Sequence, residues 1–192
     1  LRKEQYRCSD DEIRSCQIAK YFIVGKIFNS RSVLERAKRD HPMSFDIQSL
    51  KEISSSLLRL AKEARKCCDL DSLRGYEGEA ASLYFSVFDH LILQNKKIFS
   101  FKQRMKRPPK DYVNALLSFC YTILANDCAS ALEAVGLDAY VGFLHRDRPG
   151  RISLALDLME ELRSIYADRF VLTLINNRKI NASAFERQER SE

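Results

Sequence analysis

The stretch His145-Arg-Asp-Arg-Pro-Gly-Arg-Ile-Ser-Leu-Ala-Leu-Asp-Leu-Met-Glu-Glu-Leu-Arg163 joins a basic loop that carries a histidine to a segment with helical periodicity. The Pro-Gly pair favours a turn, and Ser153 suits an N-cap because its hydroxyl can accept a backbone N–H of the first helical turn. From Leu154 to Leu162, leucines recur at four-residue steps, which is the spacing of one helix face. We therefore expect a helix to begin at Ser153.

Asp157 and Glu160 are three residues apart on this helix, so their side chains project from the same side, next to the loop that carries His145. One imidazole nitrogen and carboxylate oxygens suit Mn²⁺ or Mg²⁺ better than a metal that prefers thiolates. An acid pair on an amphipathic helix is also typical of a solvated face, and a lone histidine is usually a surface or hydrogen-bonded residue. The spacing alone leaves both interpretations open, and a third metal ligand must come from elsewhere.

The composition predicts a globular chain. Its 192 residues fit one domain or a fragment of a larger protein, and 45% hydrophobic residues are ample for a core. The chain starts with Leu1 and shows neither a signal-peptide core nor an apolar run near the length of a membrane span, so we expect a soluble protein cut from a longer precursor. The six cysteines form no CxxC pair, and Cys67 and Cys68 are adjacent, which indicates reduced packing residues of a cytosolic protein.

The periodicity along the chain predicts helices throughout. No convincing strand alternation, glycine-rich phosphate loop, GxSxG motif or internal repeat occurs, so the predicted fold class is all-α. The expected helices run from a capping box at Ser9-Asp-Asp-Glu12 to about Arg39, from Ser44 or Asp46 to about Cys68, from Asp69 or Asp71 to about Leu91, from Asp111 to Gly136 as a buried central helix, from Ser153 onward, and from Phe170 to Ile175.

Residues 74–85, RGYEGEAASLYF, place two glycines in a helical pattern, where each costs about 1 kcal/mol relative to alanine. The glycines would let a backbone or a ligand come close to Glu77. A helix that begins one turn later explains them equally well. Glu79 lies two positions further along and on another side of the helix, so the two acids should not have the same role.

The basic residues are concentrated in residues 95–110, NKKIFSFKQRMKRPPK, which contain seven bases and no acid. The whole chain has a net charge of +6, so the remainder has a net charge of −1. Lysine and arginine can neutralise DNA phosphates, and we favour DNA contact over a merely soluble loop. Phe99 and Phe101 could stack on bases or anchor the segment in the core, and we favour anchoring.

Several long motifs carry a resemblance to a known family. They are RGYEGEAASLYF, PPKDYVNALLSFCYTIL, GLDAYVGFLHRDRPGRISLALDLMEELR and, nearer the start, IVGKIFNSRSVLERAKRD. In this order they resemble the C-terminal helical domain of the CRISPR-associated integrase, the universal spacer-acquisition nuclease, from about Ile13 to Lys179. The resemblance implies that residues 1–192 are a single α-helical catalytic domain from a longer protein, whose N-terminal β domain is absent from this chain.

The resemblance also implies an activity. It indicates a Mn²⁺- or Mg²⁺-dependent DNA endonuclease and integrase that inserts spacer DNA into a CRISPR array by transesterification, in antiviral defence. The implied partners are spacer-precursor and CRISPR repeat or leader DNA, a second copy of the chain in a homodimer, and a second CRISPR-associated adaptation protein, in the prokaryotic cytoplasm and without a membrane. The alternatives are a non-catalytic helical module that binds nucleic acid or protein, and a metal-dependent hydrolase of small phosphoesters.

The implied catalytic residues are Glu77, His145 and Glu160 as metal ligands, with Asp157 as a further ligand or as a group that holds His145 or metal-bound water. We expect arginines beside His145 to hold phosphates, although exposed loop arginines explain them equally well. The expected DNA-binding residues are Lys102, Arg104, Lys106, Arg107, Arg146, Arg148 and Arg151.

Overall fold

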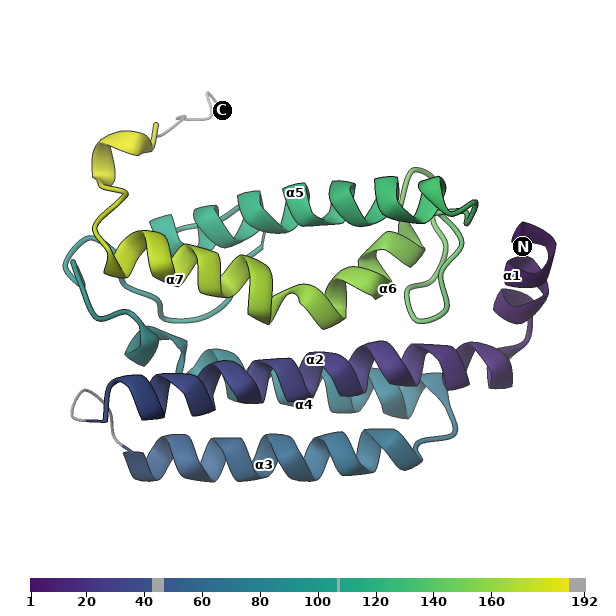
Figure 1. Cartoon of the computed structure of the whole chain (residues 1–192), viewed down its shortest axis with the longest axis horizontal. Helices are drawn as coiled ribbons and strands as arrows, with labels where there is room; N and C mark the ends of the chain where they lie inside the picture. The colour runs from purple at the N-terminus through teal and green to yellow at the C-terminus, as the bar shows by residue number, and fades with distance from the viewer. Residues whose placement is uncertain (43–46, 107, 187–192) are drawn as a thin grey trace.

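The structure is a computed structural model that describes residues 1–42, 47–106 and 108–186, and these ranges contain helices and connections but no strand (Figure 1). The all-α prediction is therefore confirmed. The principal helices are α1 (Arg2–Asp10), α2 (Glu12–Asp40), α3 (Ile47–Lys66), α4 (Leu70–Ser86), α5 (Tyr112–Ala134), α6 (Ser153–Leu162) and α7 (Arg169–Asn176).

The helices form two layers, with α2, α3 and α4 in one and α5, α6 and α7 in the other (Figure 1). The long α2 packs against α3 and α4 in its own layer and against α6 in the other, so α2 joins the two. Short segments complete the fold: 3₁₀ turns at Phe88–Leu91 (η1) and Ala182–Ala184 (η3), and a π-helical segment at Ser164–Asp168 (η2) between α6 and α7.

The start of α2 differs from the prediction. The expected capping box at Ser9 is wrong, because Ser9 lies inside α1 and Asp11, in an extended conformation, caps α2 by accepting the backbone N–H groups of Ile13 and Arg14. No helix was predicted before this cap. Long-range contacts hold α1 instead: the Gln5 amide donates to the carbonyls of Asp138 and Val141 at 2.8 Å.

The other caps follow the sequence more closely. Asp111 caps α5, as predicted, and Asp69, one of two aspartates expected to precede the helix, caps α4. Because α4 already begins at Leu70, the alternative of a later helix start is wrong. The helix was expected to end near Leu91, but α4 ends at Ser86 and the 3₁₀ turn η1 forms Phe88–Leu91. Ser153 is the first residue of α6 and makes no side-chain cap, because Ile152 occupies the N-cap position. The candidate caps Ser44 and Asp46 lie outside the described residues.

The core confirms that the phenylalanines anchor the basic segment. Phe99 and Phe101 are buried, and Phe101 packs on Phe88 with ring centroids 5.0 Å apart. Five of the six cysteines are buried, as expected of packing residues, whereas Cys68 is exposed and the expectation is wrong for it.

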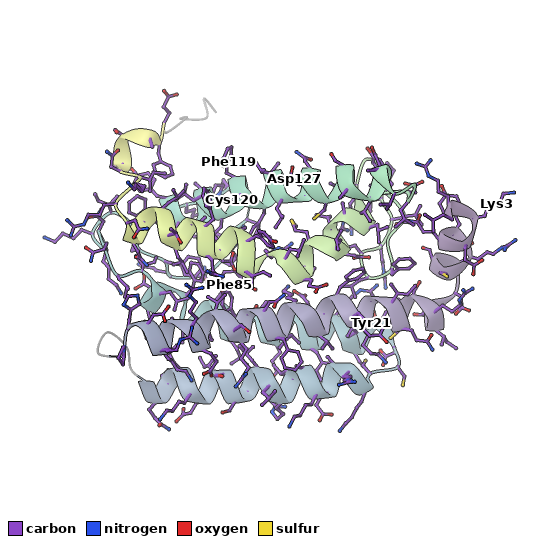
Figure 2. The ribbon with its side chains drawn as sticks, in the orientation of Figure 1. Lys3, Tyr21, Phe85, Phe119, Cys120 and Asp127 are labelled. Carbon is purple, nitrogen blue, oxygen red and sulfur yellow. The ribbon has the colours of Figure 1, made fainter. Side chains whose placement is uncertain are left out.

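Helix α5 is less buried than expected. Phe119 is 65% exposed on the outer side of α5 (Figure 2), and Ile123 is exposed one turn later. By length and apolar composition α5 alone among the described helices could cross a membrane, and 39% of its most apolar window is buried. Core helices of soluble proteins meet the same criteria, so this composition is weak evidence for a membrane span. The helix ends as predicted, with Gly136 at a φ of 81° directly after the C-cap.

Candidate metal centre

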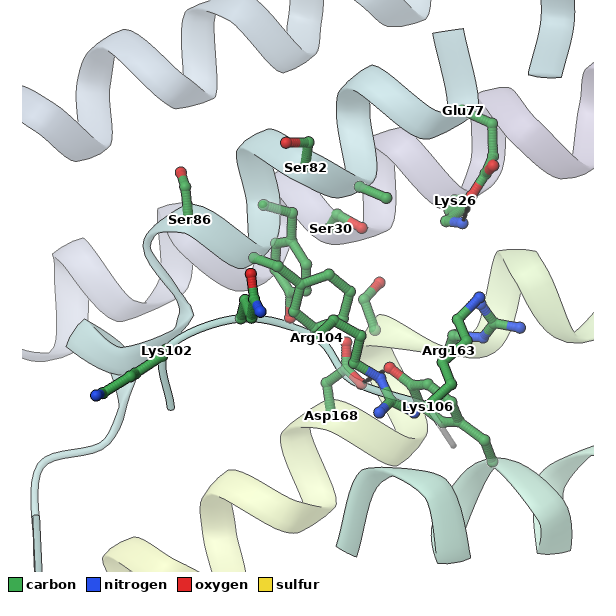
Figure 3. A pocket seen from close by; sticks show the side chains of 16 residues that line it. Lys26, Ser30, Glu77, Ser82, Ser86, Lys102, Arg104, Lys106, Arg163 and Asp168 are labelled. Atoms are coloured by element: carbon green, nitrogen blue, oxygen red, sulfur yellow. Dashed lines mark hydrogen bonds and ion pairs between the residues drawn. The ribbon is translucent and has the colours of Figure 1, made fainter. Parts of the chain in front are cut away.

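Three helices bring Lys26, Glu77 and Glu160 together. The ammonium of Lys26, from α2, contacts Glu77 Oε1 on α4 and lies 2.5 Å from Glu160 Oε2 on α6. Figure 3 shows the Lys26 and Glu77 side chains pointing toward each other across the gap between their helices. Two acids far apart in the sequence therefore meet at one cation that belongs to the protein.

Two residues fix the close approach of α2 to α6. A Cβ added at Gly25 would lie 2.9 Å from Glu161 Cγ, so the small residue makes room for α6. One turn further along α2, the Asn29 amide donates to the Glu161 carbonyl at 2.8 Å. These contacts flank Lys26 in sequence, and its backbone is thereby held against the helix that carries Glu160.

Asp157 orients His145. The fully buried Asp157 Oδ1 accepts the ring Nδ1–H of His145 at 2.6 Å and its backbone N–H at 3.0 Å. Asp157 Oδ2 accepts the backbone N–H groups of Phe143 and Leu144 at 2.6 and 2.9 Å. Since a carboxylate only accepts hydrogen bonds, the proton of the neutral ring lies on Nδ1, and Nε2 keeps its lone pair, 4.0 Å from Glu160 Oε1.

The loop before His145 is held from two sides. A Cβ at Gly142 would lie 2.8 Å from Ser153 Cβ and 2.9 Å from its backbone carbon, so only glycine permits this approach to α6. From the other side, the Arg74 guanidinium donates to the Leu144 carbonyl at 2.7 and 3.2 Å, which ties α4 to the loop. The position of His145 therefore depends on both α4 and α6.

Glu160 is buried between two cations, since Arg163 lies 2.8 Å from its Oε1 and Lys26 2.5 Å from its Oε2. Burial raises the pKa of the Glu160 carboxyl, but the charges of Lys26 and Arg163 outweigh burial and hold the pKa at about 2. Despite the close ammonium, Oε2 has no hydrogen bond of acceptable geometry among the described residues. Glu160 therefore offers a charged carboxylate whose Oε2 has the Lys26 ammonium as its neighbour and no further donor among the described residues.

A cleft of about 330 Å³ exposes the predicted ligands Glu77, His145 and Glu160 to one space. Within the ranges described, no three His, Cys, Asp or Glu side chains stand in metal-binding positions as they are, and the Lys26 ammonium lies between the two glutamates. The donors nevertheless fit Mn²⁺ or Mg²⁺, because they comprise two carboxylates that already hold a cation between them and an imidazole whose Nε2 faces Glu160.

A second cavity, of about 460 Å³, adjoins the two acids that contact Lys26, namely Glu77 and Glu160, which we call the acid pair. Both Lys26 and Glu77 line this cavity (Figure 3). Lys102, Arg104 and Lys106 from the basic segment line the same cavity. The predicted DNA-binding arginines beside His145 line the metal-site cleft instead: Arg146, Arg148 and Arg151. Basic side chains thus border the acid pair on two sides.

The bases of the basic segment differ in their surroundings. Arg104 donates to the Asn114 amide oxygen at 2.8 Å and to the Ser118 hydroxyl at 3.1 Å, so it holds the segment against α5. Lys102 and Lys106 are exposed. Arg107, also predicted to bind DNA, lies outside the described residues.

A buried polar network forms the floor of the second cavity. The Tyr121 hydroxyl donates to Asp168 Oδ1 at 2.6 Å, and the guanidiniums of Arg163 and Arg104 lie 4.7 and 5.1 Å from the Tyr121 ring centroid. Burial raises the pKa of Asp168 to about 6, although the Tyr121 hydrogen bond and the charge of Arg163 oppose the shift. Burial likewise raises the pKa of Tyr121 well above its usual value of 10.

Sequence reasoning missed Lys26, Arg163 and Arg74. A signal existed for Lys26, which follows the buried Ile23 by three residues and so falls on the apolar stripe of its helix. Arg163 likewise follows Glu160 by three residues, the spacing of a helical ion pair. Glu79 is exposed and pairs with Arg59, in agreement with the expectation that Glu77 and Glu79 have different roles.

The profile of the family described as "CRISPR associated protein Cas1" matches residues 1–191. The chain is 48% identical over 189 residues to "CRISPR-associated endonuclease Cas1 1" of Chlorobaculum tepidum, and the aligned region is 98% of this chain and 55% of that protein. Its fold is similar to a "Casposase bound to integration product" (TM-score 0.81, 30% identity, 96% of this chain and 49% of that one). It is also similar to a chain of a "Cas6-RT-Cas1--Cas2 complex" (TM-score 0.83, 29% identity, 98% and 20%). The chain spans about half the length of the curated relatives it matches.

Proposed function

The chain belongs to the CRISPR associated protein Cas1 family, and from this premise we propose that it is the helical catalytic domain of a metal-dependent DNA endonuclease and integrase of CRISPR adaptation. In the proposed reaction a DNA 3′-hydroxyl attacks a phosphodiester phosphorus during spacer insertion, and water attacks it during cleavage. In both cases the phosphorus–oxygen bond in line with the attack breaks, and the leaving oxygen takes up a proton and departs as a DNA hydroxyl. We infer that residues 1–192 act as one catalytic domain within a longer protein.

One observation carries the proposal: Glu77, His145 and Glu160 line the same cleft, although they come from α4, the α5–α6 connection and α6. We assign these three residues as ligands of Mn²⁺ or Mg²⁺. When bound, such a cation lowers the pKa of an attacking water or hydroxyl and neutralises charge on the phosphate.

The other residues of the centre position these ligands. Asp157 holds the His145 ring so that Nε2 faces Glu160, and we assign it this orienting role in preference to that of a ligand, because both of its oxygens already accept hydrogen bonds. Arg163 keeps Glu160 ionised through its contact at 2.8 Å.

Basic side chains on the two cavities supply the proposed DNA contacts. Lys102 and Lys106 line the larger cavity, and the predicted loop arginines Arg146, Arg148 and Arg151 line the metal-site cleft. A phosphate backbone that passes between the two sets would lie beside the acid pair and be neutralised on both sides. Arg104 belongs to this proposed set only if its contacts to α5 can be exchanged for DNA.

Similar solved structures support the proposed partners. One similar protein is described as bound to an integration product and another as part of a complex with Cas2. We propose that this chain likewise acts on DNA, as spacer precursor and CRISPR repeat or leader, together with a second CRISPR-associated adaptation protein. We further propose that it acts as a homodimer in the prokaryotic cytoplasm.

The proposal is tested with Glu77→Ala, His145→Ala and Glu160→Gln in Mn²⁺-dependent cleavage and strand-transfer assays on branched DNA. Each variant should lose activity while far-ultraviolet circular dichroism retains the helical signal. Glu79→Gln is the matched control, because Glu79 lies exposed on the same helix as Glu77, and this variant should keep activity. Full activity in any of the first three variants removes that residue from the mechanism.

Two outcomes would replace the proposal. If the wild-type chain and Glu77→Ala bind Mn²⁺ equally weakly while DNA binding persists, the chain is a non-catalytic nucleic-acid-binding module. If a small phosphoester is hydrolysed faster than branched DNA, the chain is a hydrolase of small substrates.

A further inference from the structure

Lys26 lies between Glu77 and Glu160, and metal binding does not explain its position. Its side chain is only 9% exposed, and it projects from the middle of α2 into the space between Glu77 and Glu160. A buried ammonium costs several kcal/mol unless it is paired. Here it is paired with the two carboxylates that the proposed metal ion would need.

We propose that Lys26 is an intramolecular counter-ion of this centre, which bridges Glu77 and Glu160 in the metal-free protein and is displaced when a divalent cation binds. The displaced ammonium enters the adjoining basic cavity and there binds a phosphate of the DNA substrate. This inference rests on the proposed function, because it requires Glu77 and Glu160 to bind the cation.

Lys26 and a divalent cation would need the same space. The Lys26 ammonium lies 2.5 Å from Glu160 Oε2, and a Mg²⁺ ion would need to stand about 2.0–2.1 Å from a carboxylate oxygen. An ammonium and a divalent cation cannot both occupy the gap between the same two carboxylates, since they would overlap and repel each other. One must leave when the other enters.

The side chain of Lys26 can move, whereas its backbone is held in place. The contacts of Gly25 and Asn29 with Glu161 hold the α2 backbone against α6 on both sides of Lys26. Lys26 therefore cannot retreat by a shift of its helix. Its four-carbon stem is flexible, so the side chain alone can change position.

A basic cavity lies next to the Lys26 ammonium. Lys26 and Glu77 line the cavity of about 460 Å³, together with Lys102 and Lys106, so the ammonium already stands at the wall of a basic space (Figure 3). A swing of the side chain away from the acid pair can place it there without crossing the core.

Charge balance supports a phosphate as the displaced ammonium's partner. In the metal-free arrangement the ammonium of Lys26 has Glu77 and Glu160 as its counter-ions. A divalent cation that takes over these carboxylates leaves Lys26 without a counter-ion, and a phosphodiester, with its single negative charge, would supply one. The displacement of Lys26 therefore couples metal binding to DNA binding.

The affinity test compares three forms of the chain by electron paramagnetic resonance titration with Mn²⁺. Lys26→Met keeps the length of the side chain and removes the competing charge, so we expect Mn²⁺ to bind about tenfold more tightly. Lys106→Met is the charge control, because Glu160 and Glu77 sense the charge of Lys106 without contacting it, and its effect should be clearly smaller. The inference is overturned if Lys26→Met binds Mn²⁺ no more tightly than the wild type or than Lys106→Met.

A second measurement needs no variant. The ¹⁵Nζ signal of Lys26 in the metal-free wild-type chain should be that of a restrained, ion-paired ammonium. Titration with diamagnetic Mg²⁺ should shift or broaden this signal at the same concentrations that saturate the metal site. A Lys26 signal that stays unchanged at saturating Mg²⁺ overturns the displacement.

A third measurement tests the destination. At saturating Mg²⁺, the gain in affinity for DNA that the metal produces should be several-fold smaller for Lys26→Met than for the wild type. An equal gain in both forms contradicts phosphate binding by Lys26.

The results separate this inference from the proposed function. If Glu160→Gln and His145→Ala bind Mn²⁺ as the wild type does, the metal centre itself is wrong. If both variants lose Mn²⁺ affinity while Lys26→Met does not change it, the metal centre stands and only the displacement of Lys26 fails.

Discussion

The carboxylate of Asp157 bonds the ring Nδ1 of His145 at 2.6 Å, and the opposite nitrogen of that ring lies 4.0 Å from Glu160. The same carboxylate accepts three consecutive backbone N–H groups of the loop that ends at His145. One buried side chain thus fixes the path of the loop, the direction of the ring and the nitrogen that is left free. The geometry makes Asp157 a positioning residue for the imidazole.

Asp157→Asn should therefore weaken metal binding without removing a ligand. An asparagine has one oxygen and one NH₂ group, so its NH₂ group would face at least one of the N–H donors that now bond to the carboxylate. Two donors cannot bond to each other, so the loop and the His145 ring lose their fixed position. Such changes behind a metal-binding histidine cost about 10- to 100-fold in affinity. Calorimetric titration with Mn²⁺ measures the effect, and an affinity equal to that of the wild type would contradict the positioning role.

Gly142→Ala should destabilise the fold and displace the His145 loop. The added Cβ would lie 2.9 Å from the backbone carbon of Ser153, which cannot move aside cheaply, so we expect a loss of about 1–3 kcal/mol. Urea denaturation followed by circular dichroism gives the free energy of unfolding. Gly75→Ala is the control, because nothing lies within 4 Å of a Cβ there and alanine favours the interior of α4 by up to ~1 kcal/mol. The prediction fails if both substitutions change stability in the same direction.

The bases of the basic segment should separate into two groups. Replacing the exposed Lys102 or Lys106 by alanine should weaken DNA binding and reduce the slope of log K against log salt by about 1 for each lost phosphate contact. Arg104→Ala should instead lower the free energy of unfolding, because Asn114 and Ser118 of α5 lose their hydrogen-bond donor. Fluorescence anisotropy at several salt concentrations and urea denaturation distinguish the groups, and an unchanged slope in both lysine variants would exclude them from the DNA interface.

Asp168 should make the stability of the protein depend on pH between about 4 and 6. Burial raises its pKa to about 6 from 3.8, so the folded protein favours the protonated carboxyl. The resulting stabilisation is fully present below pH 3.8 and is lost as the pH rises through about 6, by on the order of 3 kcal/mol.

The variant Asp168→Asn isolates this contribution, because an amide mimics the neutral acid and does not titrate. As the pH rises across this range, the free energy of unfolding of the wild type should therefore fall relative to that of Asp168→Asn. A difference that stays constant from pH 4 to pH 7 would show that Asp168 ionises as easily in the folded chain as in the unfolded one.

Local signals predicted much of the fold. The side chains of Asp69 and Asp111 cap the helices that follow them, and Gly136 terminates α5, because each of these effects depends on neighbours within a few residues. Helix α1 was missed because its sequence lacks an apolar stripe and its stability comes from Gln5, whose partners lie more than 130 residues away. The exposed outer face of α5 could not be recognised either, since an apolar sequence does not specify which side another helix covers.

The candidate site divides in the same way. Asp157 and Glu160 could be related to each other by helical spacing, whereas Glu77 was connected to them only through resemblance to a family. Lys26 escaped notice because its meaning depends on Glu77, 51 residues away, and on the contact of α2 with α6. A lysine on an apolar helix face is a usable signal, but without the fold its counter-ions cannot be identified.

The π-helical segment η2 sets the rotational position of α7 relative to α6, which carries Glu160. Its amide at Asp168 bonds back five residues to the carbonyl of Arg163, so the turn holds one residue more than an α-helical turn would. Because the wide turn absorbs this extra residue, Val171 and Ile175 of α7 reach the core from the helix run that also carries Glu160. Deleting one residue from Ser164–Asp168 would let the turn close as an ordinary α-helical turn, and α7 would keep its orientation relative to α6. A one-codon deletion at this point should therefore be tolerated better than one within α6 or α7, where no wide turn can take up the change.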